Sequence, residues 1–184
     1  MDAGTILLIL LGIIVIYAVL LFNTLVRKKH AVSASWAGIE TQLQRRYDLI
    51  PNLVETVKGY AKHEQDTLQM VIKARNEYGR SQTVAEKAEA SGELSNALGK
   101  LFALSEAYPD LKASENFRLL QEELVGTENK ISYSRQAYNN AVMDYNIAIE
   151  VFPAVVIASV LGYRKQDLFK SLGEVVNTPP KVTF

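Results

Sequence analysis

The chain has 184 residues, enough for one ordinary domain with a core, and its 20 basic residues balance its 20 acidic ones. This balance excludes a strong basic or acidic field, so we expect no nucleic-acid partner. The chain has no cysteine and only two histidines, which excludes thiol chemistry and leaves little for a metal cluster. We therefore expect no catalytic residues and no bound metal of the thiol or histidine type.

The first element is an uncharged apolar run over residues 3–22, long enough to span ~30 Å of hydrocarbon as a helix. A cleavable signal peptide needs a basic segment before the run, whereas here Asp2 precedes it and the basic residues 27–29 follow it. We predict an uncleaved transmembrane anchor over residues 1–26. The basic cluster predicts that the N-terminus lies outside the membrane and that the body lies in the cytoplasm. The residues expected to face lipid are Ile6, Leu7, Leu10, Ile13, Ile16, Leu20 and Phe22.

A long helix is predicted next, over about residues 27–78. Its apolar side chains form two rows with a period of seven, which is typical of helices that cross at shallow angles. The first row is Trp36, Leu43, Ile50 and Val57, and the second is Ile39, Leu53 and Tyr60, interrupted only by Arg46.

Pro51 lies inside this predicted helix and cannot donate a hydrogen bond to the carbonyl of Tyr47. Two outcomes are open: a kink, or a fresh helix start capped by Asp48.

Further helices are predicted over about residues 83–107, 112–152 and 154–162. Thr83 and Glu86 have the spacing of a capping box, and Pro109 ends the first of these helices. Gly126 lies inside the second at a cost of about 1 kcal/mol relative to alanine, so Pro51 and Gly126 are the candidate hinges. The second helix has an unbroken apolar seam: Phe117, Leu120, Leu124, Thr127, Ile131, Ser134, Tyr138, Ala141, Tyr145, Ala148 and Phe152.

The short apolar helix over 154–162 caps the bundle in one interpretation and contacts a membrane surface or a partner in the other. Residues 164–184 are expected to be extended or flexible, with the apolar end Val182 to Phe184 either held in a partner groove or disordered.

The predicted fold is all-α: a transmembrane helix followed by an elongated antiparallel helical bundle over residues 27–163. The helices differ in length and leave apolar seams uncovered, so a homo-oligomer is expected.

No catalytic motif is complete. His63 begins a zinc-protease pattern, but Thr67 stands where the second histidine is required, and the glycine spacing at 92–101 does not fit a phosphate loop. Polar residues in or beside the seams suggest a polar layer inside the bundle or between subunits; alternatively, they flank the seams and contact water. They are Arg46, Asn52, Glu55, Glu128, Arg135, Asn139 and Asn146.

Several long motifs in order resemble the LemA family of bacterial membrane proteins, from about Phe22 to Gly162. They are "RRYDLIPNLVETVKGYAKHE", "LGKLFALSEAYPDLKASENF", "LQEEL", "TENKI" and "YNNAVMDYN". The resemblance implies a single-pass protein of the bacterial cell (inner) membrane, with its N-terminus outside and a helical body inside. It implies that the protein has no enzyme activity and no cofactor. It also implies association with membrane proteins such as a membrane zinc protease.

The leading functional hypothesis is therefore a self-assembling membrane scaffold or adaptor. The alternatives are a membrane-associated signal transducer, an accessory subunit of a membrane protease, and an enzyme with an unrecognised carboxylate site.

Overall fold

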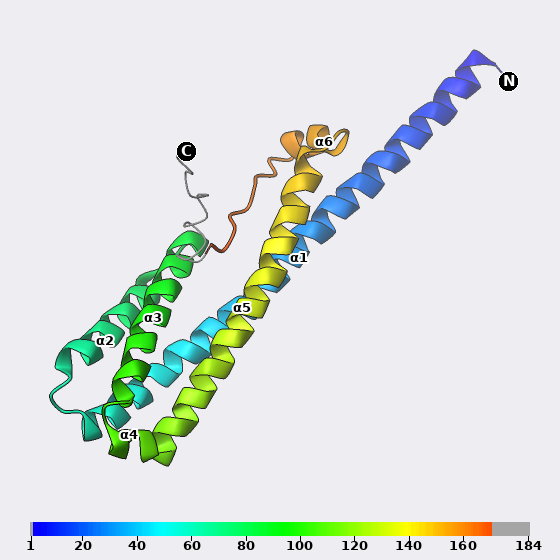
Figure 1. Cartoon of the computed structure of the whole chain (residues 1–184). Coiled ribbons are helices and arrows are strands. Elements are labelled where there is room, and N and C mark those ends of the chain that lie inside the picture. Colours follow the sequence, from blue (N-terminus) through cyan, green and yellow to red (C-terminus); the bar gives the residue numbers. More distant parts are fainter. Residues whose placement is uncertain (1, 171–184) are drawn as a thin grey trace, which may run out of the picture. The chain divides into compact units, whose positions relative to one another are not determined.

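The computed structural model describes residues 2–170, and the fold is all-α, with no strand in that part of the chain (Figure 1). It therefore confirms the predicted fold class. The end of the predicted tail, including Val182 to Phe184, lies outside the described residues. The helices are α1 (Ala3–Tyr60), α2 (Gln65–Arg80), α3 (Val84–Ser105), α4 (Pro109–Ala113), α5 (Glu115–Glu150) and α6 (Ala154–Val160).

The chain divides into two compact units. Two of the three boundaries fall inside the long helices α1 and α5, and the third follows α6. The first unit combines Met1–Ala37 with Ala137–Asp167, and the second combines Gly38–Gln136 with Leu168–Phe184.

The first unit contains the apolar start of α1. Among the described residues, α1 alone is long and apolar enough to cross a membrane as a single straight helix, and no part of its apolar window is buried. All seven residues expected to face lipid are exposed. Burial on α1 becomes complete at Leu25 and Val32, beyond the apolar run. The core of this unit is completed by Tyr138, Val142, Tyr145, Ile149, Ala154 and Ala158.

The second unit has its own core, to which α1, α2, α3, α4 and α5 contribute. The predicted rows on α1 are confirmed at Ile39, Leu43, Ile50, Leu53 and Val57, all of which are buried. From α2 and α3 the core takes Leu68, Val71, Ala74, Leu94, Ala97, Leu98 and Leu101, and from α4 and α5 it takes Leu111, Phe117 and Leu124.

Two sequence-based expectations about the helices are wrong, and one short helix was not predicted. The helix predicted over 27–78 ends at Tyr60, which is exposed, and a turn at residues 61–64 leads into the separate helix α2. The one-turn helix α4 was not predicted; Pro109 begins it because a proline at the first helical position loses no hydrogen bond. Phe152 does not continue the seam, since α5 ends at Glu150 and Phe152 is 84% exposed.

The capping box at the start of α3 is confirmed. The hydroxyl oxygen of Thr83 accepts a hydrogen bond from the main-chain N–H of Glu86 at 3.2 Å. The Glu86 carboxylate in turn accepts hydrogen bonds from the main-chain N–H groups of Gln82 at 2.8 Å and Thr83 at 3.1 Å. The hydrogen bond from the N–H of Gln82 lowers the pKa of the Glu86 carboxyl most, and the one from Thr83 lowers it further.

Pro51 does not interrupt α1, which is helical from Ala3 to Tyr60. A fresh start capped by Asp48 is therefore not observed, and Asp48 instead accepts a hydrogen bond from Gln44 at 2.8 Å. The carbonyl of Tyr47 accepts a hydrogen bond from Nε of Arg75 on α2 at 3.1 Å.

Candidate functional site

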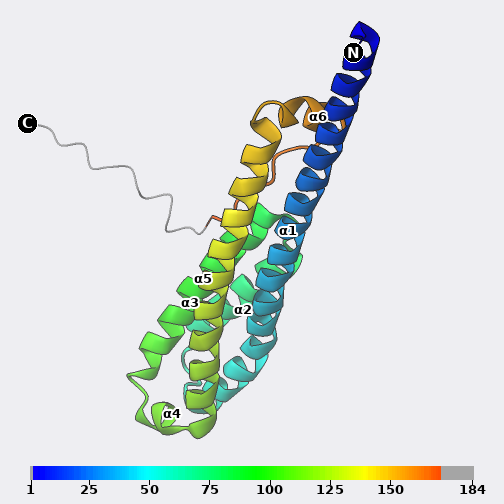
Figure 2. The same ribbon diagram turned by 90° about the vertical axis from the view of Figure 1, so that its right-hand side faces the viewer.

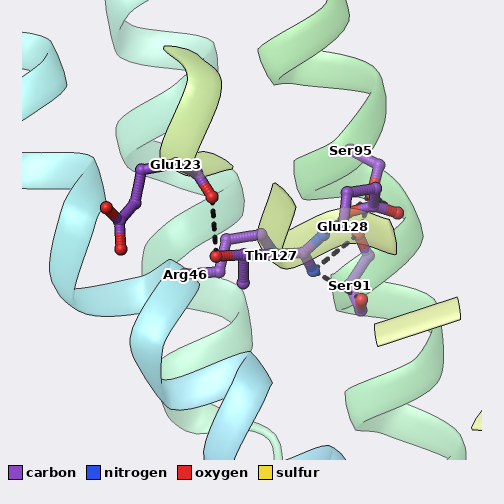
Figure 3. A network of polar contacts seen from close by, with 6 residues as sticks. All are labelled: Arg46, Ser91, Ser95, Glu123, Thr127 and Glu128. Carbon is purple, nitrogen blue, oxygen red and sulfur yellow. Dashed lines mark hydrogen bonds and ion pairs between the residues drawn. The ribbon is translucent and has the colours of Figure 1, made fainter. Parts of the chain in front are cut away.

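Arg46 on α1 is the one fully buried cationic side chain among residues 2–170, and it lies at the centre of a polar network in the second unit (Figure 3). Its Nη1 donates to the hydroxyl of Ser95 at 2.9 Å and to the carboxylate of Glu128. Its Nη2 donates to the hydroxyl of Ser91 at 2.5 Å and to the main-chain carbonyl of the same residue at 3.2 Å. One guanidinium therefore joins α1 to α3 and α5.

The serines are positioned by the helical repeat of α3. Ser91 and Ser95 are four residues apart and so lie on the same face of the helix. Ser91 is buried and Ser95 is partly buried. Their small side chains leave room for a guanidinium where leucine would fill the space. The sequence analysis considered residues 92–101 as a phosphate loop and identified neither serine. Their spacing on an otherwise apolar helix face was the available signal.

The electrostatics of the network follow from the burial of Arg46. Desolvation lowers the pKa of this guanidinium, while the negative charge of Glu128 opposes the shift. The Glu128 carboxylate also accepts a hydrogen bond from the hydroxyl of Ser95 at 3.1 Å. Arg46 Nε has no hydrogen-bond partner among the described residues, so one buried donor is unsatisfied, which is costly.

A pocket of about 490 Å³ lies beside this network, within the second unit. Its wall is polar and apolar in equal parts, and the polar part includes three serine hydroxyls, one amide, one carboxylate and one guanidinium. The lining residues are Ala88, Ser91, Gly92, Ser95, Asn96, Glu128, Ile131, Ser132, Arg135 and Phe169.

The predicted polar residues fall into separate places within the chain. Arg46 and Glu128 join the network, and Arg135 lines the adjacent pocket. Asn52 and Glu55 are exposed and stay outside the network. Glu55 instead pairs with Lys58 at 2.7 Å on the surface of α1.

Asn146 belongs to a second polar arrangement, in the first unit, where α5 holds the segment that follows α6. Its side-chain amide donates to the carbonyl of Gln166 at 3.0 Å, and its oxygen accepts from the N–H of the same residue at 2.9 Å. The hydroxyls of Tyr138 and Tyr145 donate to the carbonyls of Asp167 at 2.8 Å and Arg164 at 3.1 Å. Asn139, one turn before Met143 on the same helix, is partly buried.

The arrangement around Arg46 is suited to holding helices together. No group of three or more histidine, aspartate or glutamate side chains could hold a metal ion among residues 2–170. Ser95 lies beside a carboxylate, but this carboxylate is engaged by Arg46, and no imidazole contributes to the network.

Comparison with known proteins finds a matching family model and several similar proteins. The family model described as "LemA family" matches residues 35–184. The magnetosome protein MamQ 2 of Paramagnetospirillum magneticum is 26% identical over 188 residues, covering 87% of this chain and 69% of that protein. MamQ of Magnetospirillum gryphiswaldense is 24% identical, covering 88% and 70%. Protein LemA of Metamycoplasma hominis is 24% identical over 150 residues, covering 81% and 68%.

Proposed function

Because the chain belongs to the LemA family, we propose that it is a non-enzymatic membrane scaffold or adaptor whose helical body binds further copies of itself. The apolar start of α1 supports the membrane attachment. The proposed topology, with the body in the cytoplasm, is supported by Arg27, Lys28 and Lys29, which follow the apolar run directly.

One surface of α5 in the second unit carries this proposal. Leu119, Val125 and Tyr133 are exposed there, with Tyr133 77% exposed. Leu119, Gly126 and Tyr133 are spaced by seven residues and so lie along one stripe of the helix. We call Leu119, Val125, Gly126 and Tyr133 the outer α5 face.

Gly126 suggests what covers this face. A glycine inside a helix costs about 1 kcal/mol relative to alanine. A Cβ atom added at Gly126 would meet nothing within 4 Å, so no contact with the described part of the chain requires glycine there. Close approach of a helix from another molecule would require it. The repeat of seven favours a partner helix that crosses at a shallow angle, and a second copy of α5 has this same repeat.

The test is the mass of the full chain extracted in detergent, compared with Gly126→Leu. We expect wild type to form particles that contain several 20.5 kDa chains, and Gly126→Leu to contain fewer. Leucine favours helix more than glycine does, so the variant should fold at least as well. Gly38→Leu is the matched control, because a Cβ at Gly38 on α1 also meets nothing within 4 Å.

Two results would count against self-assembly. A wild-type particle with a single chain would contradict it directly. If Gly126→Leu and Gly38→Leu reduced the particle mass equally, the outer α5 face would not be the surface through which copies associate. If wild type is a single chain but co-purifies with another membrane protein, such as a membrane zinc protease, and Gly126→Leu alone loses it, the adaptor function replaces self-assembly.

A further inference from the structure

The end of the first unit exposes its large apolar side chains and buries its small ones. Phe152, in the turn before α6, is 84% exposed, and Val160 on α6 is 82% exposed. Ala154 and Ala158 form the buried side of α6. A helix that faces water normally has polar residues on its exposed side. Here the exposed side is apolar, and Val156 and Leu161 enlarge it.

Contacts between α1 and α5 show where this apolar surface lies along α1, relative to the apolar run. Lys28 Nζ lies 3.4 Å from the carboxylate of Asp144, and the rings of Trp36 and Tyr138 are 5.4 Å apart. From Lys28 to Trp36 the chain advances along α1, whereas the contacted residues on α5 go back from Asp144 to Tyr138. The two segments are therefore antiparallel. The six residues from Asp144 to Glu150 rise by about 9 Å.

The same rise along α1 leads from Lys28 back to Phe22. The end of α5 is therefore level with the last residue of the apolar run, and the turn with Phe152 comes after it. The chain then returns, because Lys29 Nζ lies 5.4 Å from the ring centre of Tyr163. The segment 151–162 thus lies on the apolar side of the basic cluster.

The direction of α6 also matters. It leaves α5 with a bend of 94°, and Figure 2 shows it lying across the end of α5. Its seven residues are about 10 Å long, too short to cross a hydrocarbon layer of ~30 Å.

We propose that α6 and the preceding turn lie in the interfacial layer of the bilayer, with Phe152, Val156 and Val160 among the lipid chains. The occupant is lipid because this surface is level with the end of the lipid-facing run of α1. Four basic residues flank this surface along the chain: Lys28 and Lys29 on α1, near Tyr163, and Arg164 and Lys165 after α6. Lys28 and Lys165 pair with Asp144 and Glu150, and Lys29 and Arg164 suit phosphate headgroups. This inference requires only that α1 spans a bilayer, and it does not depend on self-assembly.

The test uses fluorescence quenching in the full chain. The only tryptophan, Trp36, is first replaced by phenylalanine, and Phe152→Trp or Val160→Trp is then added. Each protein is reconstituted into vesicles of phosphatidylcholine and phosphatidylglycerol whose acyl chains carry bromine near the headgroup or near the chain end. Because both positions are more than four-fifths exposed, the new ring displaces no packed neighbour.

We expect bromine near the headgroup to quench both tryptophans more strongly than bromine near the chain end. Leu10→Trp, in the middle of the apolar run, should show the reverse order. Ala137→Trp should remain unquenched, because Ala137 is exposed and lies about 10 Å further from the apolar run than Asp144.

Quenching of Leu10→Trp without quenching at positions 152 and 160 would overturn the proposal. If those two positions then emit at short wavelength despite the absence of quenching, protein covers them instead of lipid. Failure of quenching at Leu10 would contradict the transmembrane anchor itself, so the two failures are distinguishable.

Discussion

Arg75 donates its Nε–H to the main-chain carbonyl of Tyr47 at 3.1 Å, and this carbonyl is the one that Pro51 leaves without its helical donor. The same guanidinium stacks on the Tyr47 ring, 3.8 Å from the ring centre. A side chain on α2 thus replaces a main-chain hydrogen bond of α1, which explains how α1 remains helical through a proline.

This replacement predicts coupling between Arg75 and Pro51. Arg75→Leu should lower the free energy of unfolding by about 1–2 kcal/mol through the lost hydrogen bond and ring contact. In a Pro51→Ala background the cost should be smaller, because the N–H of the new alanine can bond to the Tyr47 carbonyl. The ring contact is lost in both backgrounds and cancels in a double-mutant cycle measured by denaturation in detergent. Additive effects of the two substitutions would show that the hydrogen bond contributes nothing.

The Arg46–Glu128 pair predicts a loss of stability when its charge is removed. The guanidinium is 1% exposed and the carboxylate 48%, so Glu128→Gln leaves a buried cation without its counter-ion. We expect a loss of about 1–3 kcal/mol in thermal or chemical unfolding, below the cost of breaking a fully buried pair because water reaches Glu128. Glu55→Gln is the matched control; it breaks an exposed pair with Lys58 and should change stability by less than about 0.5 kcal/mol. Similar effects of the two substitutions would contradict a special position for Arg46.

Tyr78 predicts a loss of stability in alkaline solution. Burial raises the pKa of its phenol to about 12; the charge of Glu40 adds to the shift and Arg46 opposes it. The ordinary value is near 10, so the unfolded chain loses this proton first. The stabilisation by the neutral phenol is therefore complete below pH 10 and is lost as the pH rises toward 12.

The measurement compares thermal unfolding of wild type and Tyr78→Phe at pH 9 and pH 11. Tyr78→Phe should lose less stability between the two values than wild type. Burial also raises the pKa of Tyr138 and Tyr145. Both proteins contain these two tyrosines, so their contributions cancel in the comparison. Identical losses in the two proteins would exclude Tyr78 as a source of the alkaline effect.

Asn146 predicts local order in the segment that follows α6. Asn146→Ala removes both hydrogen bonds to Gln166, and the amide hydrogen of Gln166 should then exchange faster with deuterated water. Asn146→Asp should retain protection of that amide, because a carboxylate oxygen still accepts from the N–H. Asn140→Ala, at an exposed position of α5, serves as the control. Unchanged exchange in Asn146→Ala would show that Tyr138 and Tyr145 are sufficient to hold the segment.

Local sequence signals predicted much of the fold. The period of seven identified the buried face of α1, and the Thr83–Glu86 spacing identified the start of α3. The break after Tyr60 was missed because the residues 61–64 contain neither proline nor glycine, and Leu68 and Val71 continue an apolar pattern in α2.

The candidate site was only partly predictable. The position of Arg46 in an apolar row was a usable signal, whereas its partners Ser91 and Ser95 depend on how α3 packs in the second unit. The hydrogen bond from Arg75 to Tyr47 joins residues 28 positions apart, which no local pattern indicates. Pro51 and Gly126 as hinges stay predictions.

Two contacts hold α1 and α5 in one register: Lys28 with Asp144, and Trp36 with Tyr138. This register has a consequence for the membrane in which the protein resides. If α6 lies at the lipid surface, α1 cannot slide along its own axis to match a thicker or thinner bilayer. The length between Ala3 and the level of α6 is then constant at about 30 Å, and any hydrophobic mismatch has to be met by tilt of the anchor or by deformation of the surrounding lipid. We therefore expect the protein to favour bilayers of one thickness when membranes of several thicknesses are available.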